Sequence, residues 1–214
     1  MRNIIRLSLV GVLLAGSALA AEHRDHSTAA KQPALSAKAV QTGAAVRDLW
    51  VDHIFWTRNV VLATFAKNDA EAKAAEQQAV ANAKAIAGAI EPFYGAGAKD
   101  ALFKLLAGHY GAVKQYLLAT ASGDASGQSK ATEALTKNAE EIAVFLSKAN
   151  PNLAKDDVQG LLLAHGGHHI QQIQELKAGK YEAEAKTWAD MKAHMYVIAD
   201  ALTQALAKQF ASKF

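Results

Sequence analysis

The segment Leu49-Trp50-Val51-Asp52-His53 has two counterparts further along the chain, Leu105-Leu106-Ala107-Gly108-His109 and Leu161-Leu162-Leu163-Ala164-His165. Each begins with leucine and ends with histidine four residues later, and successive copies are 56 residues apart. Residues four positions apart share one face of an α-helix. The three segments therefore predict helices that carry a histidine on their apolar face.

The same spacing continues downstream in both polar and apolar positions. Asn82, Asn138 and His194 are also 56 residues apart, and each is followed four residues later by isoleucine. Several columns in a single register, two of them polar, indicate three copies of one ancestral unit.

Each unit is predicted to be a hairpin of two helices. Turn-forming residues lie in the middle of the units, at Lys67-Asn68-Asp69, Ser122-Gly123-Asp124 and Ala178-Gly179-Lys180. Pro92 and Pro151 lie between units, where proline disfavours continuation of a helix. The expected helices span about 37–66, 70–91, 97–121, 128–149, 154–178 and 181–212, giving hairpins at about 37–91, 97–149 and 154–212.

The predicted fold class is all-α, with one helical-bundle domain over residues 37–214 built from the three hairpins. The 194 residues that follow a cleaved leader are enough for one bundle with a sizeable core. A solenoid of stacked hairpins is the alternative, although three copies are few for that architecture.

Composition supports a folded helical domain and excludes several functional classes. The 214 residues are 51% hydrophobic and 20% charged, and they include no cysteine. Disulfides, thiolate catalysis, cysteine-ligated zinc, iron–sulfur clusters and covalent haem attachment are thereby excluded. Any bound metal is expected to have nitrogen, oxygen or thioether ligands.

Residues 1–20 are typical of a secretory signal peptide, because Arg2 and Arg6 lead into an apolar run and Ala18-Leu19-Ala20 matches a small-residue cleavage site. We expect secretion to a bacterial periplasm, no membrane span after cleavage, and a flexible segment over residues 21–36. Loss of the two arginines leaves 21 basic against 20 acidic residues, which does not favour nucleic acid as a partner. The sequence identifies no protein partner.

Cleavage after Ala20 would place Ala21, Glu22 and His23 at the new N-terminus. The free amine, two backbone amides and the imidazole could then surround one Cu(II) or Ni(II) ion in a square plane. This candidate site depends on the position of cleavage.

The repeated histidines are expected to lie in the interior. His109, for example, falls on the apolar stripe of Leu102, Leu105, Ala112 and Val113. In each hairpin the histidine and its downstream Asn or His are equidistant from the turn, so they lie at the same height on antiparallel helices, roughly 21 Å from it. Three such pairs predict one buried polar layer across the bundle.

Three interpretations of that layer are open. In a structural layer, each asparagine bonds its histidine and sets the hairpin register. In a metal centre, the histidines converge on zinc, iron, copper or nickel, while an amide or carboxylate holds the second ring nitrogen. An organic ligand such as haem is the third interpretation. The extra histidines of the third unit favour the metal centre.

The candidate residues fall into two groups. The metal ligands are the layer histidines and the histidine one turn after His165, namely His53, His109, His165, His194 and His169. The residues expected to hold those rings from behind are Asn82, Asn138, Glu141, Asp190 and Asp200.

Three motifs resemble an uncharacterised group of small bacterial helical-bundle proteins. They are Trp50-x-x-His53-x-x-Trp56-Thr57-Arg58, Pro92-Phe93-Tyr94-Gly95 and Asn138-Ala139-Glu140-Glu141-Ile142-Ala143. The resemblance covers most of the chain after residue 20. It implies a helical bundle and no particular mechanism.

The order of His53, His109, the His165-x-x-x-His169 pair and His194 with Asp200 is similar to that of haemerythrin-like di-iron ligands. The chain departs from that pattern, because Val113 stands where glutamate is needed and Asp200 is one residue too far from His194. The similarity is therefore an analogy for a metal-binding bundle.

The sequence thus favours a secreted bundle that binds a transition metal through a buried histidine layer, for sequestration, sensing or redox chemistry. The alternative is a metal-free interaction or chaperone-like protein whose layer is purely structural. Enzymatic activity stays open, because the common catalytic motifs are missing from the sequence whereas an open metal position can activate water.

Overall fold

A computed structural model describes residues 35–214. The predicted signal peptide, nearly all of the 21–36 segment and the candidate copper or nickel site at Ala21, Glu22 and His23 lie outside the described residues. Leu35–Phe214 forms one compact unit.

Six long helices account for most of this unit. They are α1 (Ala37–Phe65), α2 (Asp69–Ala89), α4 (Ala96–Ser122), α5 (Ala125–Ala149), α6 (Lys155–Lys177) and α7 (Tyr181–Gln209). A short α3 (Glu91–Tyr94) and a terminal 3₁₀ turn, η1 (Ala211–Lys213), complete the described chain, which contains no strand. The predicted all-α helical bundle is confirmed.

Two boundaries differ from the sequence expectation for clear physical reasons. The segment after α2 was expected to be a break, but Pro92 stands in the first turn of α3, where proline is tolerated. Helix α5 begins three residues earlier than expected because the side chain of Asp124 accepts a hydrogen bond from the backbone N–H of Gly127.

The three hairpin turns each contain one residue in the left-handed backbone region. These are Lys67, Gly123 and Gly179, with φ angles of 56°, 77° and 67°. Glycine adopts this conformation without strain, and it commonly ends helices in this way. The turns therefore lie where the sequence predicts them.

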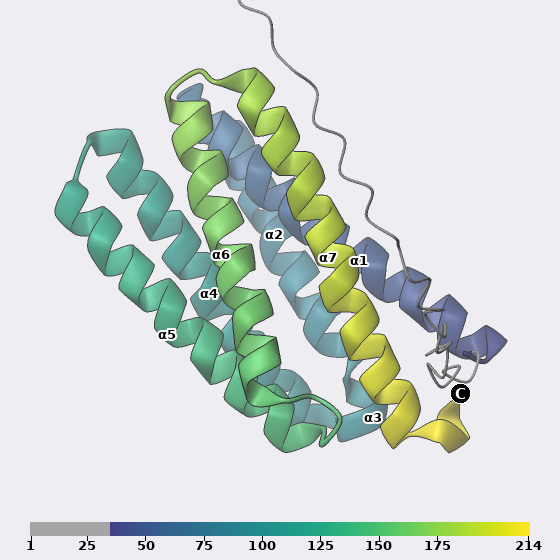
Figure 1. The fold of residues 1–214 in the computed structure, drawn as a ribbon. Helices are drawn as coiled ribbons and strands as arrows, with labels where there is room; N and C mark the ends of the chain where they lie inside the picture. Colours follow the sequence, from purple (N-terminus) through teal and green to yellow (C-terminus); the bar gives the residue numbers. More distant parts are fainter. Residues whose placement is uncertain (1–34) are drawn as a thin grey trace, which may run out of the picture. The chain divides into compact units, whose positions relative to one another are not determined.

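The helices form a closed ring rather than a stack. Helix α1 packs against α2 and α7, α4 against α2 and α5, and α6 against α5 and α7. Because the third hairpin packs back onto the first, the solenoid alternative is wrong. Figure 1 shows the three hairpin turns at one end of the bundle and α3 at the other.

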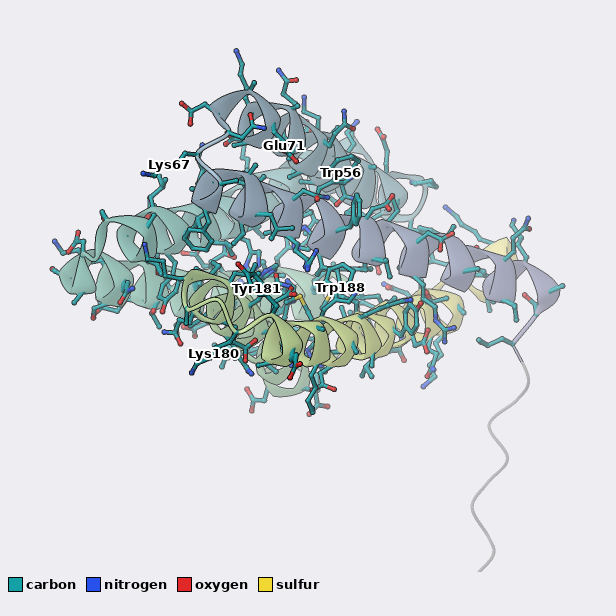
Figure 2. The ribbon with its side chains drawn as sticks, turned by 90° about the horizontal axis from the view of Figure 1, so that it is seen from above. Trp56, Lys67, Glu71, Lys180, Tyr181 and Trp188 are labelled. Carbon is teal, nitrogen blue, oxygen red and sulfur yellow. The ribbon has the colours of Figure 1, made fainter. Side chains whose placement is uncertain are left out.

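The view along the bundle from the turns shows how two hairpins meet (Figure 2). Lys67 and Lys180 mark the turns of the first and third hairpins, and Trp188 lies in the seam between α1 and α7. The Arg58 guanidinium of α1 lies 5.6 Å from the ring centroid of Trp188. It also forms two hydrogen bonds to Glu184 of α7, at 2.6 and 2.8 Å.

Apolar side chains form a core above and below the level of the histidines. On the side of the turns, one cluster includes Val61, Val113, Leu117, Leu135 and Ile173. On the side of α3, another includes Trp50, Ile54, Ile86, Leu102, Met191, Met195 and Ile198. No helix of the described chain combines the length and apolar character needed to cross a membrane.

Candidate metal centre

Four histidine side chains meet in the interior of the bundle. His53 comes from α1, His109 from α4, and His165 and His169 from α6. One nitrogen of each lies within 4.8 Å of the corresponding nitrogen of every other, and all four residues are buried. The structure thus brings together four of the five histidines that the sequence proposes as metal ligands.

The four rings are arranged almost as a tetrahedron. The ring centroids of His53, His109 and His165 form a triangle with sides of 6.0, 5.5 and 5.3 Å. His169 stands 5.7, 6.0 and 4.4 Å from these three centroids. Each hairpin supplies one corner of the triangle, and the second histidine of α6 supplies the fourth position.

The spacing of the nitrogens is close to that of a metal site. With metal–nitrogen bonds of 2.0–2.1 Å, the ligand atoms of a tetrahedral site lie roughly 3.3 Å apart. The Nε2 atoms of His165 and His169 are already 3.1 Å apart. Since none of the other nitrogens is more than 4.8 Å from its neighbours, small rotations of the rings would complete the site.

The buried environment keeps these rings neutral at pH 7. Burial lowers the pKa of His53 to about 3 and that of His109 to about 4. Burial, together with the charges that neighbouring histidines would carry, lowers the pKa of His165 and His169 well below the usual 6.5. Neutral imidazole is the form that binds metals, because a ring nitrogen then has a free lone pair.

Two of the ring nitrogens have no hydrogen-bond partner among the described residues. They are Nε2 of His109 and Nδ1 of His165. A buried polar atom without a partner costs on the order of 1–3 kcal/mol, so it calls for an explanation. A metal ion bound to Nε2 of His109 would provide one.

The downstream polar residues bond to backbone rather than to the four histidines. Nδ2 of Asn82 donates to the Leu49 carbonyl, and Nδ2 of Asn138 donates to the Leu105 carbonyl, both at 2.9 Å. Nε2 of His194 lies 2.8 Å from the Leu161 carbonyl. We call these three bonds the hairpin clamps, because each ties the second helix of a hairpin to the first.

The clamps change the assignment of three predicted residues. Asn82 and Asn138 were expected to hold the histidine rings, and His194 was expected to be a ligand. Instead, each bonds the carbonyl one turn before the histidine of its own hairpin, and His194 stays outside the group of four. Residue pairs 56 positions apart make equivalent bonds, but the ancestral triplication itself stays a prediction.

The three predicted carboxylates lie away from the histidines. Glu141 pairs with Lys137 at 3.8 Å and Asp190 with Lys186 at 2.6 Å, each on its own helix. Asp200 pairs with Arg47 of α1 at 2.6 Å. Among the residues that the structure describes, the ligand group therefore contains four imidazoles and no carboxylate.

Sequence reasoning missed a buried polar network next to the site. Gln172, three residues after His169, is fully buried and donates a hydrogen bond to Glu184 at 2.8 Å. Glu184, only 2% exposed, also accepts the two bonds from Arg58. The position of Gln172 on the same helix face as His165 and His169 was a signal for its burial.

Comparisons with known proteins give no match: no family model, no curated protein and no solved structure matches this chain. Function therefore has to be inferred from the four histidines themselves.

Proposed function

We propose that the protein binds one transition-metal ion per chain through His53, His109, His165 and His169. The observation that carries this proposal is the convergence of four buried imidazoles whose nitrogens lie within 4.8 Å of one another. Burial lowers the pKa of each ring, so a metal would meet little competition from protons at neutral pH.

The ligand set indicates which ions would bind. Imidazole nitrogen suits zinc, copper, iron and nickel, whereas calcium and magnesium require mainly oxygen ligands. The chain supplies no thiolate, and the described group contains no carboxylate. We therefore infer a borderline-soft divalent ion or monovalent copper.

The signal-like leader supports a role outside the cytoplasm. There a buried site on three rigid hairpins would hold a metal for sequestration, sensing or redox chemistry. Because all four proposed ligands come from long helices, their geometry is set by helix packing rather than by loops.

A purely structural layer is the second candidate function of these histidines. The hairpin clamps favour it in part, since they show that Asn82, Asn138 and His194 do fix the helices to one another. The four converging histidines take no part in the clamps, however. Haem is disfavoured, because a porphyrin leaves iron at most two axial positions for protein ligands.

The test compares adjacent histidines on α6. The full chain would be purified without a metal-binding tag, stripped with chelator and titrated with Zn²⁺ and Co²⁺, and bound metal would be measured by elemental analysis. We expect one ion per chain and the intense visible absorption of tetrahedral Co(II). The variant His169→Ala should weaken binding about a hundredfold or more, since loss of an outer partner alone costs 10- to 100-fold.

The matched control is His168→Ala, one residue earlier on the same helix and only half-buried. It should bind metal like the parent protein. The proposal fails if the folded parent binds no metal stoichiometrically, or if the two variants lose equal affinity while circular dichroism shows both to be folded.

A further inference from the structure

A cavity of about 180 Å³ adjoins the histidine group on the side of α3. It is lined by all six long helices, and many of its wall residues occur in sets of three spaced 56 residues apart. The sets are Val46, Leu102 and Val158; Trp50, Leu106 and Leu162; Ile86, Ile142 and Ile198; and Ile90, Leu146 and Leu202. The cavity therefore lies centrally, where the three hairpins face one another.

The cavity meets the proposed metal centre on one face. His53, His109 and His165 line it, whereas His169 does not. The triangle of three imidazoles, one from each hairpin, therefore borders the cavity, and His169 stands behind that triangle. A metal held by these four residues would have its side opposite His169 turned toward the cavity.

The remaining wall is almost entirely apolar. Its other polar side chains are Thr42, Tyr94 and Asn150. Asn150 donates a hydrogen bond to the Tyr94 hydroxyl at 3.0 Å, and that hydroxyl donates to Gln209 at 2.7 Å. These groups at the α3 end are thus already paired, and the histidine end is the polar end of the cavity.

Charge indicates what the cavity would accept. Four neutral imidazoles do not offset the charge of a divalent ion, and no carboxylate of the described chain joins the group. An ion buried in an apolar interior attracts a counter-charge strongly. An anionic donor entering from the cavity would supply that charge at the face opposite His169, and zinc sites can expand to five ligands.

Size indicates the body of that ligand. A cavity of about 150 Å³ lined by apolar side chains is known to hold benzene. The present cavity is slightly larger, so it suits one aromatic ring or a short alkyl chain, and its apolar walls disfavour a polar body.

We propose that this cavity is the ligand site of the metal centre and that it takes a small monocarboxylate with a compact apolar body, the carboxylate lying at the metal. This inference rests on the proposed metal binding. It adds the chemical class of the molecule that the metal centre recognises.

The experiment uses benzoate as the probe, with toluene as its uncharged counterpart and acetate as the head group without a body. Each is titrated by calorimetry into metal-loaded and metal-free protein, and metal content is measured on the same samples. Loaded protein should bind benzoate at least about tenfold more tightly than either toluene or acetate. Metal removal should abolish that preference for benzoate while leaving weak toluene binding.

A spectroscopic readout reports the coordination directly. In the Co(II)-loaded protein, benzoate should reduce the intensity of the visible bands, as four-coordinate cobalt becomes five-coordinate, and toluene should not. Metal bound stoichiometrically without any response to benzoate would overturn the ligand proposal and leave metal binding intact. Protein that binds toluene but no metal would overturn both.

The cavity itself is tested by a pair of alanine variants on α2. Ala89 lines the cavity, and Ala85, one turn earlier, is exposed. Ala89→Leu should retain one metal per chain but weaken benzoate binding at least about tenfold, because the added side chain occupies the space of the ligand body. Ala85→Leu should change neither. Equal benzoate affinity in the two variants would contradict the proposal.

Discussion

The Nε2 atoms of His165 and His169 approach within 3.1 Å from successive turns of α6. Both rings are buried and neutral, so one donates a proton to the other in the metal-free protein. The same two nitrogens are spaced as adjacent ligands of one ion. A single helix thus presents two metal-binding positions, and the other hairpins each need to add only one.

Chelation is expected to lower the stability of the metal-loaded protein. An ion present at 100 times its dissociation constant stabilises the folded state by about 2.7 kcal/mol if it does not bind the unfolded chain. For a domain of this size that corresponds to a rise in Tm of roughly 5–10 °C. Differential scanning calorimetry with and without EDTA measures the shift.

The control for the chelation experiment is His169→Ala, whose Tm should not respond to EDTA. An equal response in parent and variant would mean that the ion binds elsewhere.

Acidification is expected to destabilise the metal-free protein. In the folded state the pKa values of His53 and His109 are about 3 and about 4, against about 6.5 in the unfolded chain. Below pH 6.5 the unfolded chain therefore binds more protons, and stability falls as the pH falls toward those folded-state values. Between pH 7 and pH 5 the loss is about 2 kcal/mol for each of these histidines.

Urea denaturation of chelator-treated protein at pH 7 and pH 5 measures this effect. The variant His53→Leu should reduce the difference between the two pH values by about 2 kcal/mol, whatever its effect on stability at pH 7. Greater stability of the parent at pH 5 would contradict the predicted direction.

Much of the fold could be predicted from sequence because helix periodicity and turn chemistry are local. Gly123 and Gly179 lie at the predicted turns and adopt the left-handed conformation there. The short helix α3 was missed, because Pro92 was taken as a break although proline is compatible with the first turn of a helix. Closure of the ring by contact between α1 and α7 is a tertiary feature that local patterns do not specify.

The candidate site could be predicted in height but not in rotation. The common spacing puts His53, His109 and His165 at one level, and the four-residue spacing adds His169 to the same face. Which side chains on the second helices face the centre depends on how each helix turns about its axis, so His194 was proposed as a ligand. Its place in the column of Asn82 and Asn138 was the available signal for its role in a clamp. The cavity arises from side-chain packing and has no sequence signature.

The clamp role of His194 predicts an unusual tolerance. His194→Asn should be nearly neutral in stability, because Asn82 and Asn138 make the equivalent bond in the other hairpins. His194→Leu leaves the Leu161 carbonyl without its partner and should cost about 1–3 kcal/mol. Chemical denaturation measures both.

Both His194 variants should retain one metal per chain, since His194 lies outside the group of four. Loss of metal from folded His194→Asn would instead make this residue a ligand.

The ion pair between Arg58 and Glu184 is expected to matter far more for stability than the pair between Arg47 and Asp200. Both pairs join α1 to α7, and both are bidentate. Glu184 is 2% exposed, whereas Asp200 is 35% exposed. Removing the partner of a buried charge costs about 3–5 kcal/mol, and an exposed pair contributes about 0–1 kcal/mol.

The variants Arg58→Ala and Arg47→Ala therefore form a matched pair, with expected losses in the free energy of unfolding of about 3 and under about 1 kcal/mol. The larger loss follows from the Glu184 carboxylate, which would keep Gln172 as its one remaining hydrogen-bond partner in the described chain. The second variant Glu184→Gln, combined with Arg58→Ala, removes that buried charge and should recover part of the loss. Similar losses for the two arginine variants would show that the carboxylate of Glu184 reaches water once Arg58 is gone.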